Sequence, residues 1–390
     1  MSKSDVASCP AVRAEFSEGE EMSEWKETTL GDILEIKYGK DHKALNDGNY
    51  PCLGSGGIMR FVDSFLYDDE SILIPRKGTL NNIIYQNSPF WTVDTMFWSV
   101  INKSKVLPKY LFYQLTLIDF NNLNVGSAVP SLTVPVISQI EITLPPLPKQ
   151  KAIASVLSSL DDKIDLLHRQ NKTLEAIAED LFRQWFIEEA QEDWEEVCLE
   201  DITQRITDGS HYSPPTTEEG MPMASVKDMY DWGINKDTCR RISYEDYKKL
   251  VDADCRPLTN DILIAKDGSY LKHVFVVEQD LDIVILSSIA ILRPNFKMHP
   301  ILLALFLKQP STLDQLENIV TGAVIPRIVL KDFRKFQLLL PPKNIQERAV
   351  SSIVPLYRKC WGNNKQIRTL EKLRDTLLPK LMSGEVRVAL

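Results

Sequence analysis

The chain has 390 residues, of which 44% are hydrophobic and 25% charged, as is typical of a folded globular protein. Its net charge of −9 excludes a generally basic protein that coats nucleic acid. The sequence contains no run of about 18 apolar residues, so we expect no membrane-spanning helix. The N-terminus lacks an apolar signal core and the six cysteines include no C-x-x-C pair, so we expect a cytoplasmic protein with reduced thiols and no membrane partner.

The first two segments of the chain differ in composition. Residues 1–24 are acidic and poor in apolar anchors, which predicts a disordered acidic tail. Residues 25–147 predict a domain of short strands and turns, with a buried strand at 72–74 and a helix at 108–117 that begins at a proline. We expect this domain to close with a strand at 140–144, because two prolines follow it.

A long helix is expected over residues 148–193. Its apolar residues recur in alternating steps of four and three, the heptad spacing of a coiled-coil seam. The seam positions are Ile153, Leu157, Leu160, Ile164, Leu167, Asn171, Leu174, Ala178, Leu181 and Trp185. Such a stripe needs a partner, because it cannot be left in water.

The sequence then repeats itself. The offset between the copies is 169 residues at Trp25, 190 residues at Ile72 and 196 residues at Gln150. The ends of the two copies are therefore alike, while the interior of the second copy carries the extra residues. We expect a second domain at 194–341, then a second long helix with a C-terminal tail at 342–390.

Each predicted helix has the other as its simplest partner. Residues 148–193 carry 6 basic and 10 acidic residues, whereas residues 342–390 carry 10 and 4, so pairing between the two is favoured over self-association. Each seam contains one asparagine, Asn171 or Asn363, a residue type that fixes helix register at some cost in stability. The sequence thus predicts an α+β fold: two similar mixed α/β domains, separated by two long helices that form an antiparallel coiled coil, in a pseudo-two-fold internal repeat.

No set of residues predicts catalysis. The chain has no phosphate-binding glycine loop, no metalloprotease helix motif and no hydrolase nucleophile elbow, so we expect no catalytic residues of its own. The five histidines are spread too widely to suggest a metal site. Glu35 and Lys37 have the E-x-K spacing of many nucleases, but a solvated surface is the simpler interpretation.

Three motifs resemble the specificity subunit of type I restriction-modification systems. Leu-Pro-Pro-Leu-Pro-Lys-Gln at 144–150 precedes the first helix, a similar motif at 340–346 precedes the second, and Leu-Leu-Pro-Lys-Leu-Met-Ser-Gly-Glu at 377–385 closes the chain. Residues 208–211 also resemble an early motif of the domains in this family, although the first copy departs from it at 38–42. The resemblance covers nearly the whole chain from Trp25.

This resemblance implies partners and a division of labour. Each domain would be a target recognition domain that reads one half of a bipartite site in double-stranded DNA, and the paired helices would set the spacer and dock two methyltransferase (modification) subunits. Two restriction subunits, which carry the translocase and nuclease, would complete the complex. S-adenosylmethionine, ATP and magnesium would be bound by those partners, with no cofactor in this chain. The alternative is a coiled-coil scaffold that joins proteins without reading DNA.

The expected DNA contacts lie in polar loops after equivalent strands, because such side chains read base edges and hold the DNA backbone. In the first domain the candidates are Arg76, Lys77, Gly78, Thr79, Asn81 and Asn82, followed by Lys40, His42, Arg60, Ser127 and Ser131. In the second domain they are Lys266, Asp267, Ser269, Tyr270 and Lys272, followed by Asp208, Ser210, His211, Tyr212 and Arg327.

Overall fold

The computed structural model describes residues 25–126, 129–267, 272–316, 320–321 and 327–388. The predicted acidic tail at 1–24 lies outside them. The chain forms two compact units. Unit 1 contains the residues up to Ile164 and those from Thr369 on, and unit 2 contains Asp165–Arg368.

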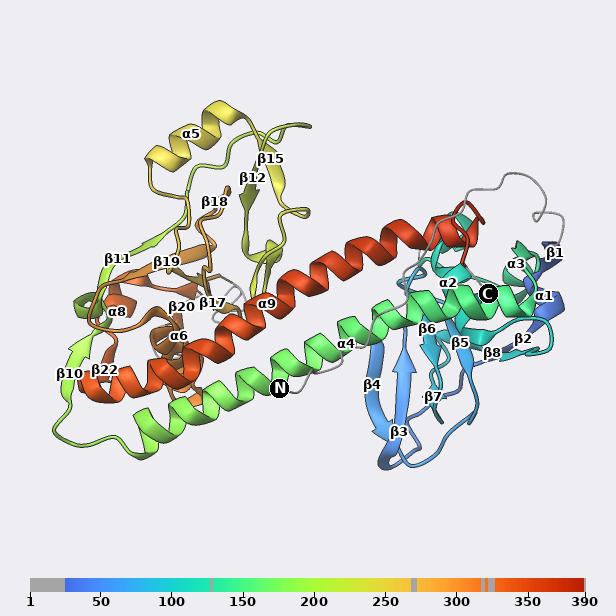
Figure 1. The fold of residues 1–390 in the computed structure, drawn as a ribbon, viewed down its shortest axis with the longest axis horizontal. Helices are drawn as coiled ribbons and strands as arrows, with labels where there is room; N and C mark the ends of the chain where they lie inside the picture. Colours follow the sequence, from blue (N-terminus) through green and yellow to red (C-terminus); the bar gives the residue numbers. More distant parts are fainter. Residues whose placement is uncertain (1–24, 127–128, 268–271, 317–319, 322–326, 389–390) are drawn as a thin grey trace, which may run out of the picture. The chain divides into compact units, whose positions relative to one another are not determined.

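Unit 1 is built from small sheets with helices packed on them (Figure 1). Its strands are β1 (Lys26–Thr29), β2 (Leu34–Tyr38), β3 (Asp47–Gly54), β4 (Gly57–Val62), β5 (Ser71–Pro75), β6 (Ile84–Gln86), β7 (Trp91–Thr92), β8 (Met96–Ile101) and β9 (Glu141–Leu144). They form the sheets β1-β9, β2-β8-β5-β6 and β4-β3-β7. The helices are α1 (Leu30–Ile33), α2 (Pro108–Thr116), a 3-10 turn at Phe120–Leu123 and α3 (Val134–Ser138). The predicted buried strand at 72–74 and the helix that begins at Pro108 are confirmed.

Unit 2 has the same plan with additions. Its strands are β10 (Glu195–Cys198), β11 (Thr203–Asp208), β12 (Met221–Ala224), β13 (Met229–Tyr230), β14 (Gly233–Ile234), β15 (Arg240–Ile242), β16 (Ile262–Ala265), β17 (Val274–Val276), β18 (Val284–Ile285), β19 (Ile289–Pro294), β20 (Val320–Thr321), β21 (Arg327–Ile328) and β22 (Gln337–Leu340). Its helices include 3-10 turns at Leu199–Ile202 and Val226–Asp228, then α5 (Tyr244–Asp252), α6 (Pro300–Lys308), α7 (Pro310–Leu316) and α8 (Leu330–Arg334). The four-stranded sheet β11-β19-β16-β17 repeats the order β2-β8-β5-β6.

The internal repeat is confirmed at the level of strand register. Lys26 pairs with Leu144 in unit 1, and Glu195 pairs with Leu340 in unit 2, which are the same positions after the two sequence offsets. The parallel pair β3-β7 is likewise matched by β12-β18. The extra residues of the second copy include α5, whose Tyr247 packs with the buried face of the β12 sheet.

The two long helices are α4 (Leu147–Arg183), which continues as a π-helical turn at Gln184–Glu188, and α9 (Lys343–Met382). Within unit 2, Asn171 contacts Asn363, and the Arg348 guanidinium lies 4.8 Å from the centre of the Trp185 ring. Within unit 1, Asp161 accepts a hydrogen bond from Arg374, while Ile153 shares a core with Leu381. In each unit the partner number falls as the α4 number rises, so the predicted antiparallel pairing is confirmed.

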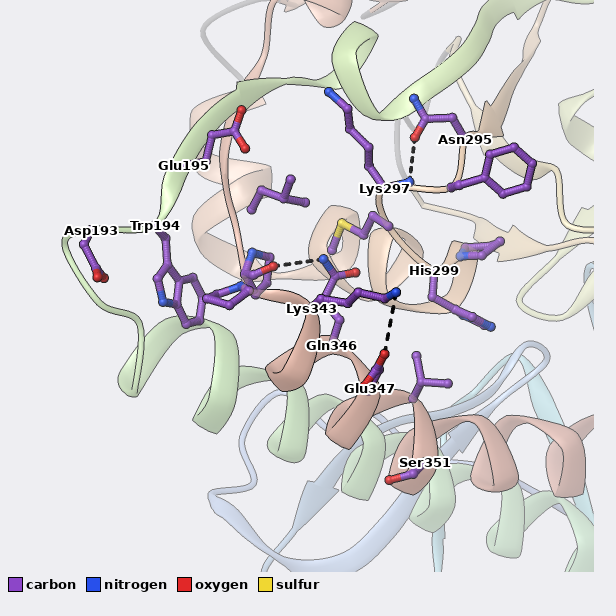
Figure 2. A pocket seen from close by; sticks show the side chains of 17 residues that line it. Asp193, Trp194, Glu195, Asn295, Lys297, His299, Lys343, Gln346, Glu347 and Ser351 are labelled. Atoms are coloured by element: carbon purple, nitrogen blue, oxygen red, sulfur yellow. Dashed lines mark hydrogen bonds and ion pairs between the residues drawn. The ribbon is translucent and has the colours of Figure 1, made fainter.

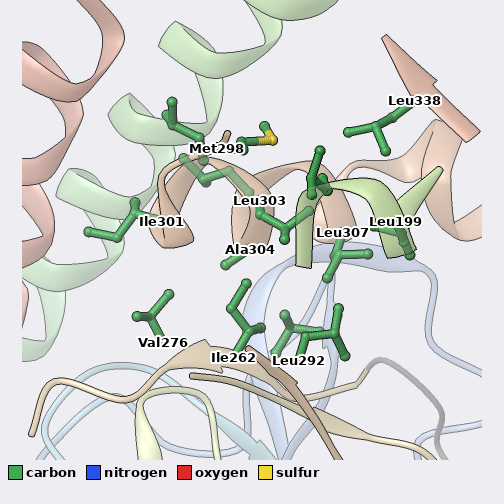
Figure 3. Close-up of a cluster of buried hydrophobic side chains, with 14 of the residues drawn as sticks. Leu199, Ile262, Val276, Leu292, Met298, Ile301, Leu303, Ala304, Leu307 and Leu338 are labelled. Atoms are coloured by element: carbon green, nitrogen blue, oxygen red, sulfur yellow. The ribbon is translucent and has the colours of Figure 1, made fainter. Parts of the chain in front are cut away.

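The largest core lies in unit 2, where α6 covers the four-stranded sheet (Figure 3). Ile301 and Leu307 of α6 share this core with Ile262 and Leu292 of the sheet, and these four side chains are at most 1% exposed. Burying one such side chain contributes on the order of 1.5–3 kcal/mol. This packed core supports the ends of β11 and β16 and therefore the start of the loops that follow them.

Candidate nucleic-acid interface

The predicted loop after β5 is joined to the segment that precedes α3. Lys77 and Ser131 form an isolated antiparallel bridge, Gly78 N donates to Pro130 O at 3.2 Å, and Leu132 N donates to Arg76 O at 2.9 Å. The loop and the segment therefore form one surface rather than two independent loops.

The loop 76–82 is also held by hydrogen bonds from its own asparagine side chains to neighbouring segments. Asn82 Nδ2 donates to Ser55 O at 2.6 Å and Asn81 Nδ2 donates to Asp119 Oδ1 at 2.9 Å, so both amides support the loop. Gly78 has φ +92°, a conformation that disfavours other residues. The side chains of Lys77 and Thr79 remain exposed, which leaves them available to a ligand.

Arg76 is held by an aromatic ring that is not among the predicted DNA contacts. Its guanidinium lies 5.3 Å from the centre of the Tyr38 ring, within the range of a cation–π contact, and Nη1 donates to Asp94 O at 3.3 Å. Tyr38 ends β2 and is 55% exposed. Tyr38 and Arg76 lie far apart in the sequence, so the sequence alone gives no signal for this pair.

The secondary candidates of unit 1 lie in different surroundings. His42 lines a cleft of about 580 Å³ together with Ser55 and Thr95. Because Ser55 accepts a hydrogen bond from Asn82 and Thr95 accepts one from Arg76, this cleft adjoins the loop 76–82. Lys40 has an exposed side chain, and its backbone accepts a hydrogen bond from the indole of Trp91. Arg60 instead donates to Leu45 O at 2.5 Å and approaches Asp47. Ser127 lies outside the described residues.

Unit 2 joins the equivalent two segments in the same way. Asp267 and Arg327 form an isolated antiparallel bridge at the positions that correspond to Lys77 and Ser131, and Ile328 N donates to Lys266 O at 3.2 Å. Here the side chains pair as well: Arg327 Nε and Nη2 donate to the two carboxylate oxygens of Asp267 at 2.9 and 3.1 Å.

Lys266 and Asp208 are turned toward each other. Their charged atoms lie 2.5 Å apart, and the Lys266 side chain is only 4% exposed. The pair stands where Arg76 and Tyr38 stand in unit 1, so the same two backbone positions carry a cation–π contact in one unit and a buried ion pair in the other. These two side chains, both expected as DNA contacts, support the loop from within.

The early motif of unit 2 follows directly on this pair. His211 Nε2 lies 3.4 Å from Asp208, Ser210 is buried, and its hydroxyl donates to Tyr212 O at 2.8 Å. The Tyr212 ring is 58% exposed. Lys272 is exposed, while Ser269, Tyr270 and the segment 322–326 lie outside the described residues.

The glycine of the early motif is held in the same way in both units. Gly39 N donates to Met96 O at 3.0 Å and Gly209 N donates to Ile289 O at 3.1 Å. A Cβ at Gly39 would lie 2.0 Å from Val93 O, and a Cβ at Gly209 would lie 2.3 Å from Ile285 O. The close backbone approach explains why glycine is kept while its neighbours differ.

The proline-glutamine motif before each helix also has a structural role. Gln150 is 1% exposed, donates to Pro145 O at 2.8 Å and accepts from Leu107 N at 2.9 Å, which ties the helix start to the domain. Gln346 donates to Pro341 O at 2.9 Å and faces a cavity of about 950 Å³ (Figure 2). His299 lines the same cavity from the start of α6.

Two structural features are absent from the part of the chain that the structure describes. It holds no group of three or more His, Cys, Asp or Glu side chains that could bind a metal ion. Its helices include none that is long and apolar enough to cross a bilayer.

Comparison with known proteins gives the class of protein. Residues 22–176 and 191–372 both match the type I restriction modification DNA specificity domain. Two matches in tandem cover most of the sequence, and the chain belongs to this family.

Individual relatives agree with that assignment. The MjaIX specificity subunit of Methanocaldococcus jannaschii is 27% identical over 354 residues, which cover 83% of this chain and 79% of the relative. The HindI specificity subunit of Haemophilus influenzae is 22% identical and is covered completely, with 94% of this chain matched. The crystal structure of the S subunit of a type I system from M. genitalium has the same fold, with a TM-score of 0.60 over 92% of this chain and 96% of that one, at 18% identity.

Proposed function

We propose that this chain is the subunit that gives a type I restriction-modification complex its DNA sequence specificity, with each unit reading one half of a bipartite site. The observation that carries the proposal is the duplicated surface. Both units join the loop after a central strand to the segment before a short helix by the same backbone bridge. The side chains on that shared frame differ, as reading two different half-sites requires.

The frame also suggests how the reading side chains are distributed. In unit 1, Lys77 and Ser131 form the bridge, and Arg76 and Thr79 lie close to it in the same loop. In unit 2, Arg327, Tyr212 and Lys272 present exposed polar groups. Side chains of these types donate to base edges or to phosphate oxygens. The scaffold alternative gives no reason for two matched polar surfaces and is not favoured.

The remaining parts of the proposal concern partners. Two methyltransferase subunits would dock on the paired helices and the domains, and they would supply S-adenosylmethionine and much of the positive field that an acidic chain lacks. Two restriction subunits would bring ATP, magnesium and DNA cleavage. The chain itself would contribute no catalytic residue and would act in the cytoplasm. Alone, it would bind DNA weakly.

The test is a methylome. The chain is expressed with its neighbouring methyltransferase subunit in a host without other adenine methylation, and modified adenines are mapped by single-molecule sequencing. We expect a bipartite motif with a fixed spacer that disappears when the chain is deleted.

A loop exchange then shows which half-site unit 1 reads. The loop 76–82 and Ser131 are replaced with their counterparts from unit 2, and one half of the motif should change while the other half and the spacer stay. A soluble complex that methylates no motif would support the scaffold alternative and would refute the proposal.

A further inference from the structure

The ion pair between Asp267 and Arg327 uses only one side of the guanidinium group, and the donors at its end point away from the carboxylate. The two bonds to the carboxylate use Nε and Nη2 of Arg327, the side of the planar group. Neither bond uses Nη1. The end of the guanidinium, formed by Nη1 and the second proton of Nη2, is a two-donor fork of the kind that binds two acceptors in one plane.

The exposed fractions of the two side chains show that this two-donor fork faces solvent. The Arg327 side chain is 56% exposed, whereas the Asp267 side chain is only 16% exposed. The carboxylate is therefore the inner member of the pair and the guanidinium the outer one. A long side chain that would otherwise sample many rotamers is held in one orientation before any ligand arrives, which lowers the entropy cost of binding.

The residue that precedes Asp267 is buried and also makes an ion pair. The residue before Asp267 is Lys266, which is 4% exposed and bonded to Asp208, and Ile328 N donates to Lys266 O. Unit 1 has Lys77 and Ser131 at the positions of Asp267 and Arg327, so it has no buttressed arginine there. The arrangement is thus specific to unit 2.

We infer that Arg327 reads a guanine in the half-site of unit 2 and that Asp267 is the positioning residue that aims it. The inference rests on the proposed function. In the major groove guanine presents two adjacent acceptors, O6 and N7, and an arginine fork that donates to both is the commonest specific contact to that base. No other base presents two acceptors there, so the half-site of unit 2 should contain a G·C pair that Arg327 reads. Unit 1 has no arginine at the corresponding positions, so its half-site should not need a G·C pair for the same reason.

The test uses the complex of the full chain with its methyltransferase subunit, on duplexes that carry the motif found by the methylome. Each G·C pair of the unit 2 half-site is replaced in turn by A·T. For wild type, one replacement should weaken binding by roughly 5- to 150-fold, the usual range for a lost bidentate base contact. In the Asp267→Asn complex the same replacement should cost much less, because the affinity for the intact site has already fallen.

Base analogues locate the contact. At the sensitive position, 7-deazaguanine removes N7 and should weaken wild-type binding, whereas hypoxanthine keeps O6 and N7 and should not. Arg327→Lys retains the charge but loses the fork, so it should lose discrimination at this pair and keep its salt-dependent attraction to DNA.

Two internal controls separate this role from a folding defect. Discrimination in the half-site of unit 1, and at the other pairs of the unit 2 half-site, should be unchanged in both variants. A unit 2 half-site without a G·C pair, or full discrimination in Asp267→Asn, overturns the inference alone. Absence of any bipartite specificity in the wild-type complex overturns the proposed function and this inference together.

Discussion

His299 is a single side chain through which pH should act on unit 2. It precedes α6, and its Nδ1 accepts a hydrogen bond from Ile301 N at 3.2 Å, which caps the helix that covers the main sheet. Burial, assisted by the charge of Arg358, holds the pKa of His299 below its ordinary value of 6.5. A protonated Nδ1 cannot accept this bond, so the cap is a property of the neutral ring.

The direction of the pH effect follows from that lowered pKa. The unfolded chain binds a proton near pH 6.5 more readily than the folded chain, so the contribution of His299 is present above that pH and is lost as the pH falls toward the folded-state value. We predict faster hydrogen exchange in the first turn of α6 at pH 5.5 than at pH 7.5, after correction for the intrinsic rate. His299→Asn, which can cap without titrating, should remove this difference. Substitution of the exposed His168 by Asn should leave it intact.

Some of these residue-scale contacts could be predicted from the sequence and others could not. The repeat offsets located Arg76 and Lys266 on matching loops, because the strands before them are alike. Their supporting partners, Tyr38 and Asp208, lie on a different strand, and nothing local in the sequence states which strand pairs with which. The ion pair between Asp208 and Lys266 could not be predicted, because only the sheet order shows that β11 and β16 both flank β19.

At the scale of elements, the long helices were the most predictable part of the chain. Seam positions repeat locally, and the ten seam residues, nine in α4 and Trp185 in the turn that continues it, are all buried or half-buried in the structure. The seam also predicted Asn171 and Asn363 as polar core residues, and they are 4% and 1% exposed. The third member of their cluster, Asn364, was missed because it stands outside the seam.

The asparagine cluster makes a prediction about stability. Asn363 Nδ2 donates to Asn171 Oδ1 at 2.8 Å, and Asn171 Nδ2 donates to Asn364 Oδ1 at 2.9 Å. Asn171→Leu leaves the buried amide of Asn363 without this acceptor, which should cost about 1–3 kcal/mol. The measurement is the urea midpoint of α-helical circular dichroism.

The double variant Asn171→Leu/Asn363→Leu tests whether the loss comes from the unpaired amide. Replacing both of these groups should recover part of the stability, since apolar seam residues then meet each other. The part that stays lost reports on Asn364 Oδ1, which no longer accepts a hydrogen bond from Asn171. Ile177→Ala, at a position of α4 that is 43% exposed, is the matched control and should have little effect. A double variant no more stable than Asn171→Leu would contradict this explanation.

At the scale of the whole molecule, both halves of the chain share one scaffold but are not equally elaborated. The β1-β9 and β10-β22 pairs keep the same register, whereas unit 2 adds α5 and its small core. The shared strand pairs could be predicted, because the two copies of the repeat are alike at their ends. The inserted residues could not, because nothing in the first copy corresponds to them.

The proposed role of the helices as a spacer gives the last prediction. Seven residues inserted in α4 after Ile164, with seven inserted in α9 before Thr369, keep both seams in phase because seven is the heptad period. Each helix becomes about 10 Å longer, at 1.5 Å per residue, which corresponds to roughly three base pairs at 3.4 Å each. We expect the methylome motif to keep both half-sites and to gain about three base pairs of spacer.

An insertion in α4 alone supplies the control, because it places the two seams out of step. That variant should fail to assemble or should lose methylation. If the double insertion methylated the original motif with its spacer unchanged, the helices would not set the distance between the half-sites, although each unit could still read its own sequence.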